Sequence, residues 1–107
     1  MINPTEKIVI AVVVFDRIGN FIKWCKLARL FKSQFPNALE IRIIHNCNDL
    51  AISEKWKSTS SKFPVTYIRR ENKGLDIGVF QDVCKNSLNG FEDNYSYLLW
   101  FTDDCFP

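Results

Sequence analysis

The chain has 107 residues, of which 47% are hydrophobic and 24% charged, and its formal net charge is +2. A chain of this length builds one domain around one core, and the composition is that of an ordinary soluble globular protein rather than a disordered one. The Lys and Arg residues are scattered along the sequence and interleaved with acidic residues, so we expect no nucleic-acid partner. We therefore expect residues 1–107 to form a single domain.

Targeting and cysteine patterns point to a cytoplasmic protein. No apolar run approaches the roughly 20 residues of a membrane-spanning helix, and the N-terminal MINPTEK lacks the basic and apolar regions of a signal peptide. We expect no membrane span. The four cysteines (Cys25, Cys47, Cys84 and Cys105) have no CxxC spacing, and His45 is the single histidine. We therefore expect reduced thiols rather than a zinc or disulfide framework.

The first two predicted elements are a strand and a helix. Residues 7–14 (KIVIAVVV) form a continuous, largely β-branched run, which is typical of a strand buried on both faces. Near-helical spacing of apolar residues then predicts a helix that Gly19 or Asn20 caps and that ends near Phe35, before a proline. Its predicted apolar face consists of Ile22, Trp24, Cys25, Leu27, Ala28, Leu30 and Phe31.

The middle of the chain repeats this alternation. Residues 40–45 (EIRIIH) predict a second strand, at whose end we expect His45 to have a satisfied hydrogen bond. Residues 49–60 predict a weaker helix with Asn48 or Asp49 at its cap. Its apolar residues are Leu50, Ile52 and Trp56. Residues 64–69 (PVTYIR) predict the third strand.

The last part of the chain predicts a third helix and a fourth strand. The stretch ENKGLDIGVFQDVCKNSL is a glycine-bearing loop that opens a helix. The apolar face of that helix is predicted to consist of Ile77, Phe80, Val83, Cys84 and Leu88. Residues 95–101 predict the fourth strand. Strands that alternate with helices indicate right-handed βαβ units, a mainly parallel sheet and helices on both of its faces.

Polar and aromatic residues follow each predicted strand, at the edge where such sheets bind ligands. These residues are Phe15, Asp16 and Arg17, then residues 46–49, then residues 69–74, and finally Thr102, Asp103 and Asp104. A nucleotide fits this set, because an aromatic wall accommodates a base and an asparagine both donates to and accepts from a pyrimidine edge. One or two carboxylates suffice for Mg²⁺ or Mn²⁺ bound to a diphosphate.

The order KIVIAVVVFDR, EIRIIHNCND, RRENKGLDIG and YLLWFTDDCFP resembles the nucleotide-binding half of GT-A glycosyltransferases, most of all family 2, over essentially the whole chain. The resemblance implies a Rossmann-like three-layer α/β/α fold with strand order 3-2-1-4. It also implies a nucleotide-diphospho-sugar donor, a divalent metal ion (Mg²⁺ or Mn²⁺) and a glycan or other hydroxyl acceptor, as in polysaccharide biosynthesis.

The resemblance also implies roles for individual residues. The stretch Thr102, Asp103, Asp104 matches the DXD-type motif, in which the middle residue contacts the donor ribose and the last ligates the metal. Asn46 matches the position that contacts the base edge. The other residues implied in nucleotide binding are Val14, Phe15, Asp16, Asn72 and Gly74. The metal ligand is therefore expected to be Asp104 alone, because Thr102 stands where the motif commonly has its first aspartate.

The chain is expected to be a fragment of a longer protein. In family 2 an inverting enzyme uses a carboxylate base that follows the DXD motif, and the sequence ends at Pro107, before such a base. We expect these residues to bind the donor without transferring sugar. In the implied strand order the fourth strand lies at an edge of the sheet, which favours self-association.

Other interpretations remain open. The domain can be a non-catalytic nucleotide-binding module. An Asp pair after a strand also occurs as a turn or cap, and NKG is a common loop in which Gly74 supplies a positive φ. A signalling receiver is disfavoured, because its acid pair follows the first strand and its acceptor Asp the third, where this chain has Arg69. No nucleophile-elbow sequence supports a Ser-His-Asp hydrolase.

Overall fold

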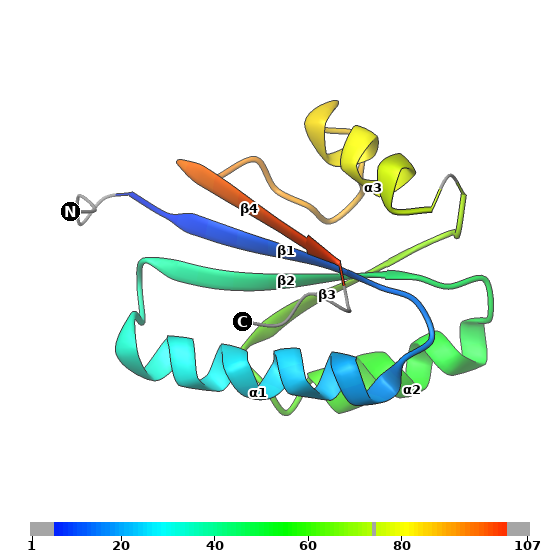
Figure 1. Ribbon diagram of the computed structural model, residues 1–107, viewed down its shortest axis with the longest axis horizontal. Helices are drawn as coiled ribbons and strands as arrows, with labels where there is room; N and C mark the ends of the chain where they lie inside the picture. The colour runs from blue at the N-terminus through cyan, green and yellow to red at the C-terminus, as the bar shows by residue number, and fades with distance from the viewer. Residues whose placement is uncertain (1–5, 74, 103–107) are drawn as a thin grey trace.

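The described residues form a four-stranded parallel sheet with helices on both faces (Figure 1). The computed structural model describes residues 6–73 and 75–102. Its elements are β1 (Ile8–Val14), α1 (Ile18–Gln34), β2 (Leu39–Asn46), α2 (Leu50–Ser60), β3 (Val65–Arg70), α3 (Leu75–Cys84) and β4 (Tyr97–Thr102). The strand order is β3-β2-β1-β4, and every pairing is parallel. The predicted α/β fold and the predicted strand order are therefore confirmed.

Both faces of β1 are buried, as its continuous β-branched run predicts. α1 and α2 cover one face of the sheet and α3 covers the other (Figure 1). On the α1 and α2 face, β1 contributes Ile10, Val12 and Val14 to the core. On the α3 face it contributes Val9, Ala11 and Val13. The central strand therefore joins two hydrophobic cores, one for each helix layer.

α1 differs from its prediction at both its start and its surface. It begins at Ile18, and the residue at its N-cap is Arg17, which makes no side-chain cap bond, so Gly19 and Asn20 lie inside the first turn. The predicted core residue Leu30 is 51% exposed. The buried residues are Phe21, Trp24, Cys25 and Ala28. The prediction missed Phe21, whose ring stacks on that of Trp56 at a centroid distance of 4.7 Å.

α2 has the predicted cap but a narrower buried stripe. The Asp49 carboxylate accepts hydrogen bonds from the backbone N–H groups of Ala51 and Ile52, at 2.9 and 3.2 Å. Of the three apolar residues named for this helix, Leu50 and Ile52 are 63% and 44% exposed, and only Trp56 is buried. The buried residues are Ser53, Trp56 and Ser60, which recur at helical spacing.

α3 is shorter than the apolar pattern predicts. It ends at Cys84, which is exposed, and Leu88 is buried but lies beyond the helix. Phe80 is 46% exposed and meets the Trp100 ring edge-on at 5.2 Å. The buried residues of this helix include Val79 and Val83, of which only Val83 was predicted. The side chain of Ile77 lies outside the described residues.

A buried arginine connects β2 to the segment that precedes β4. The side chain of Arg42 donates hydrogen bonds to the Glu92 carbonyl and to Asn94 Oδ1, both at 2.5 Å, and pairs with Glu40 at 3.1 Å. Its guanidinium also lies over the Phe91 ring, 4.7 Å from the centroid. These contacts hold residues 91–94 against the sheet, and β4 follows directly.

β4 is an edge strand. It pairs with β1, and two large apolar side chains on one of its faces, Tyr97 and Leu99, are 52% and 46% exposed. No helix in the described part of the chain is both long and apolar enough to cross a membrane.

Candidate functional site

The carboxyl ends of the parallel strands form one edge of the sheet. Strand register places Val14 beside His45, His45 beside Arg69, and Asn46 beside Arg70. On the other side of β1, Thr102 lies beside Val13. Residues that are far apart in the sequence therefore meet where parallel α/β sheets bind their ligands.

An open pocket of about 760 Å³ lies at this edge. Its lining residues come from the last residue of β2, from the segments that follow β1, β2 and β3, from the start of α1 and from the first two turns of α2. They are Phe15, Asp16, Ile18, Asn46, Cys47, Asn48, Asp49, Ile52, Lys55, Trp56 and Asn72. This volume lies within the usual range for small-molecule sites, 300–1,000 Å³.

Four predicted nucleotide-binding residues line this pocket together: Phe15, Asp16, Asn46 and Asn72. Val14 does not line it, because its side chain is 0% exposed and belongs to the core under α1 and α2. Gly74, Asp103 and Asp104 lie outside the described residues.

Arg70 organises the pocket wall that Asn46 belongs to. Asn46 is only 3% exposed, and its Oδ1 accepts a hydrogen bond of 3.1 Å from Nη1 of Arg70. The same nitrogen donates to the carbonyl groups of Glu71 and Lys73, at 3.0 and 2.7 Å. Nε of Arg70 donates to Asp82 of α3 at 2.7 Å. One guanidinium thus connects β2, the loop after β3 and α3.

Gly78 allows that close arrangement. A Cβ atom added at this position would meet the backbone carbonyl oxygen of Lys73 and would lie 2.9 Å from Nη2 of Arg70. The second glycine of the NKGLDIG stretch is therefore needed for packing. Arg70 lies within residues 69–74, which were predicted to be at the ligand-binding edge, but neither it nor Gly78 was given an individual role. Their position beside the predicted Asn72–Gly74 element was the only signal in the sequence. The pairing of Arg70 with Asp82 spans 12 residues, so local spacing could not predict it.

The loops after β2 and β3 are also joined directly. The backbone N–H of Asn72 donates to Oδ1 of Asn48 at 2.8 Å, and Nε of Arg69 donates to the Cys47 carbonyl at 3.0 Å. The backbone N–H of Cys47 donates to the Arg70 carbonyl at 2.9 Å. One hydrogen bond therefore joins the two loops directly, and two more hold the loop after β2 against the last two residues of β3.

A buried histidine holds the loop after β1. His45 is 0% exposed, and its Nε2 lies 2.7 Å from the Phe15 carbonyl oxygen, which only accepts. Nε2 must therefore carry the proton, and Nδ1 accepts from the Tyr67 hydroxyl at 2.6 Å. That hydroxyl lies 2.8 Å from Oγ of Ser53. The expected satisfied hydrogen bond at His45 is confirmed.

The surroundings of His45 favour its neutral form. Its ring stacks on Trp56, with centroids 4.0 Å apart and planes at 11°. Burial lowers the pKa of His45; the hydrogen bond to the Phe15 carbonyl opposes this and the nearby Arg69 charge adds to it. A neutral His45 keeps the tautomer that positions Phe15, so the network stabilises the β1 side of the pocket.

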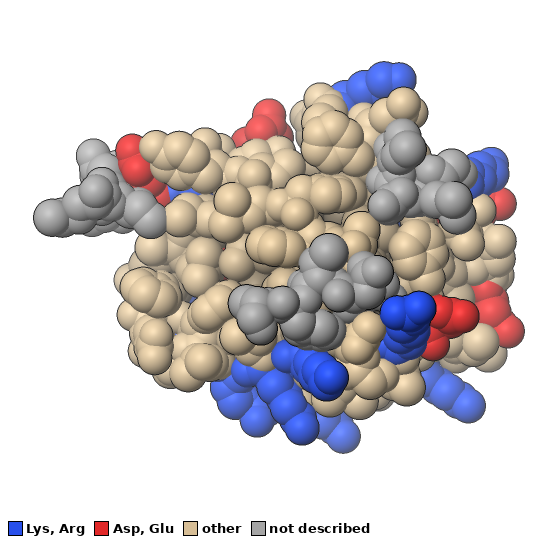
Figure 2. Space-filling view, in the orientation of Figure 1, with Lys and Arg blue, Asp and Glu red and all other residues tan. Residues whose placement is uncertain are grey.

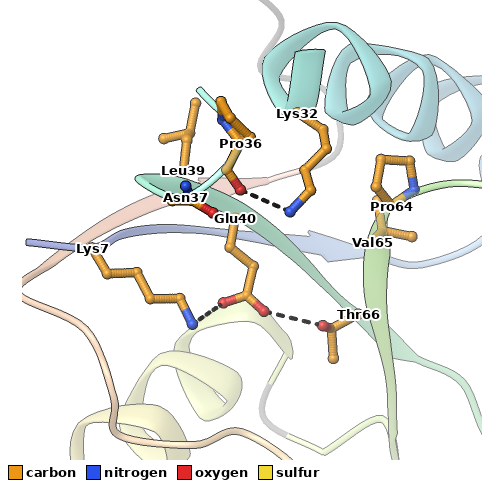
Figure 3. A pocket seen from close by; sticks show the side chains of 9 residues that line it. All are labelled: Lys7, Lys32, Pro36, Asn37, Leu39, Glu40, Pro64, Val65 and Thr66. Carbon is orange, nitrogen blue, oxygen red and sulfur yellow. Dashed lines mark hydrogen bonds and ion pairs between the residues drawn. The ribbon is translucent and has the colours of Figure 1, made fainter. Parts of the chain in front are cut away.

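A second pocket, of about 400 Å³, lies at the opposite end of the strands, where β2 and β3 begin (Figure 3). Its charged groups interact with one another or with backbone: Lys7 pairs with Glu40 at 2.9 Å, and Lys32 donates to the Pro36 carbonyl at 2.8 Å. Burial of Glu40 opposes its ionisation, but hydrogen bonds from Lys7 and Arg42 outweigh burial and lower the Glu40 pKa. Internal pairing makes this pocket the weaker candidate.

No three His, Cys, Asp or Glu side chains gather as a metal site among residues 6–73 and 75–102. The predicted metal ligand Asp104 belongs to the residues that the structure does not describe, so its fit to a metal is not tested.

In comparisons with protein-family models, with curated proteins and with solved structures, nothing matches this chain.

Proposed function

We propose that this domain binds the nucleotide-diphospho-sugar donor of a GT-A-type glycosyltransferase. One observation supports the proposal above others: Phe15, Asp16, Asn46 and Asn72, which lie at or just after the ends of three different strands, line a single pocket at the carboxyl edge of the sheet. The same four residues are implied in donor binding by the resemblance to family 2.

The proposal assigns a role to each side of the pocket. Phe15 packs against the base, and Asn46, whose orientation Arg70 fixes, reads the base edge. Asp103 contacts the ribose. Asp104 holds Mg²⁺ or Mn²⁺, which neutralises charge on the diphosphate when bound. Lys55 adds a positive charge to the pocket wall, a contribution that sequence analysis did not anticipate.

Calorimetry with UDP, GDP and dTDP, each with Mn²⁺ and with EDTA, tests this proposal. We expect saturable binding of at least one nucleotide that is stronger with metal. Asn72→Ala should weaken it about 3- to 10-fold, since one hydrogen bond is lost. Asn37→Ala is the matched control, because Asn37 lines the opposite pocket, and it should leave affinity unchanged. Absence of saturable binding by the folded domain would contradict the proposal.

The alternative function is a nucleotide-binding module without catalysis. Donor turnover separates the two when it is measured on a protein in which this domain is joined to a segment that carries a catalytic base, because the domain alone is expected to bind the donor without transferring sugar. A glycosyltransferase transfers the sugar to a glycan or other hydroxyl acceptor, whereas a binding module leaves the donor intact when metal and acceptor are present. We place either activity in the cytoplasm.

We also propose self-association through β4. β4 lies at one edge of the described sheet, and an open strand edge pairs readily with another strand. The exposed side chains of Tyr97 and Leu99, on one face of β4, add apolar surface beside that edge. Light scattering over a concentration series should show oligomers that Leu99→Lys reduces. The control is Leu50→Lys, an equal change at an exposed helix residue. A strictly monomeric wild-type chain would refute this pairing.

A further inference from the structure

Basic residues that are scattered along the sequence gather on one side of the fold. α1, α2 and the turn after α2 contain seven of the chain's 14 Lys and Arg residues but only one of its 12 Asp and Glu residues, Glu54. This part therefore carries six net positive charges and the remainder of the chain four net negative charges. The basic face consists of Lys23, Lys26, Arg29, Lys32, Lys55, Lys57 and Lys62.

All seven side chains of the basic face are exposed. Figure 2 shows Lys and Arg gathered along the lower edge of the molecule, in the region of α1 and α2. Arg29 and Lys32 donate to backbone carbonyl groups, which leaves their charges un-neutralised. Lys26, Lys55, Lys57 and Lys62 form no ion pair with any described residue. By contrast, Arg42 and Arg70 are paired with carboxylates elsewhere in the fold.

Apolar side chains are interspersed with these charges. Leu30 is 51% exposed and lies one helical turn after Lys26 and two turns after Lys23, so the three residues share the outer stripe of α1. At the two ends of the same helix, Ile18 and Phe35 are 44% and 50% exposed. A helix that presents both Lys and large apolar side chains to solvent matches the chemistry of a lipid headgroup region.

We propose that the basic face docks on an anionic lipid surface, with Leu30 entering the headgroup layer. Six net positive charges complement a leaflet rich in anionic lipid, which attracts each nearby Lys or Arg. The exposed apolar residues favour lipid over nucleic acid, whose phosphate backbone offers no site for leucine. This docking does not depend on nucleotide binding. It leaves the pocket at the margin of the basic face, because Lys55 belongs to that face and also lines the pocket.

Co-sedimentation with phosphatidylcholine vesicles, with and without phosphatidylglycerol, tests the docking. We expect the chain to bind only the anionic vesicles, and added salt to release it. Lys26→Glu combined with Lys57→Glu should lower the partition coefficient at least about tenfold. The matched control, Lys73→Glu combined with Lys85→Glu, makes the same charge change outside the basic face and should lower it less than about twofold.

A third variant tests the role of the apolar residue. Leu30→Gln keeps every charge and should weaken binding to anionic vesicles about threefold or more, since it removes buried apolar area. Circular dichroism should show that all variants fold. The proposal would be overturned by equal binding to neutral and anionic vesicles, by equal losses in the two charge-reversal variants, or by no effect of Leu30→Gln. It would also be overturned if single-stranded RNA bound more tightly than the vesicles.

Discussion

Nη1 of Arg70 donates a hydrogen bond of 3.1 Å to Oδ1 of Asn46, across neighbouring strands at the carboxyl edge of the sheet. The same guanidinium reaches Asp82 of α3 and two carbonyl groups of the loop after β3. A planar group with several fixed donors can satisfy all these acceptors at once, which a lysine cannot. The orientation of Asn46 in the pocket therefore depends on a residue outside the pocket lining.

Replacement of Arg70 should accordingly affect stability and binding together. We expect Arg70→Lys to lower the free energy of unfolding by about 1.5 to 3 kcal/mol, because several hydrogen bonds to a charged donor are lost. Urea unfolding measures this, and nucleotide affinity should fall in the same variant. Arg29→Lys is the control, since Arg29 is exposed and makes one carbonyl hydrogen bond. Equal effects at the two positions would contradict the organising role of Arg70.

The two helical glycines Gly78 and Gly19 should respond in opposite directions to alanine. Gly78→Ala places a methyl group against the Lys73 carbonyl and Arg70, so we expect it to lower stability by at least about 1 kcal/mol. Gly19→Ala meets nothing within 4 Å and should raise stability by about 0.5 to 1 kcal/mol, because alanine favours the helix. Thermal unfolding of both variants tests this. A gain in stability at Gly78 would show that the loop does not pack as described.

Stability should fall between neutral pH and mild acid because of His45. Burial lowers its pKa in the folded state, so the unfolded chain binds the proton more readily. The contribution is fully present above the unfolded pKa, about 6.5, and is lost as pH falls to the folded pKa. The expected slope is at most about 1.4 kcal/mol per pH unit.

Two features allow this pH effect to be assigned to His45. His45 is the single histidine of the chain, and the carboxylate of Glu40, whose pKa is also lowered, titrates below its ordinary value of about 4.3. In urea unfolding at pH 7.5 and pH 5.5, His45→Gln should show nearly equal stability at both values. If the wild type were equally stable at both, His45 would not be buried in its neutral form.

Replacement of Asp103 and of Asp104 should have different effects on the metal dependence of nucleotide affinity. If the proposed donor site is correct, Asp104→Asn abolishes the gain in nucleotide affinity that Mn²⁺ provides, because that side chain is the proposed ligand. Asp103→Asn weakens binding with and without metal. Calorimetry with Mn²⁺ and with EDTA measures both effects. Unchanged affinity in both folded variants would return this pair to the interpretation as a surface turn.

Local patterns were sufficient to predict the elements of this fold. A β-branched run predicted β1 with both faces buried, and Asp49, one of the two predicted caps of α2, is the residue that caps it. The alternation of strands and helices predicted a parallel sheet. These predictions succeed because periodicity and capping are properties of a few neighbouring residues. The donor-site roles taken from the family resemblance stay predictions.

Only the tertiary structure decided which side chains meet. Leu30, Leu50 and Ile52 fit an apolar pattern, yet they are exposed, because the narrow buried stripes of α1 and α2 point elsewhere. The link between Arg70 and Asn46 joins residues 24 positions apart, and it depends on strand register, which local spacing does not encode. A net charge of +2 likewise concealed the basic face, because its residues belong to α1, to α2 and to the turn after α2, which only folding places on the same side of the sheet (Figure 1).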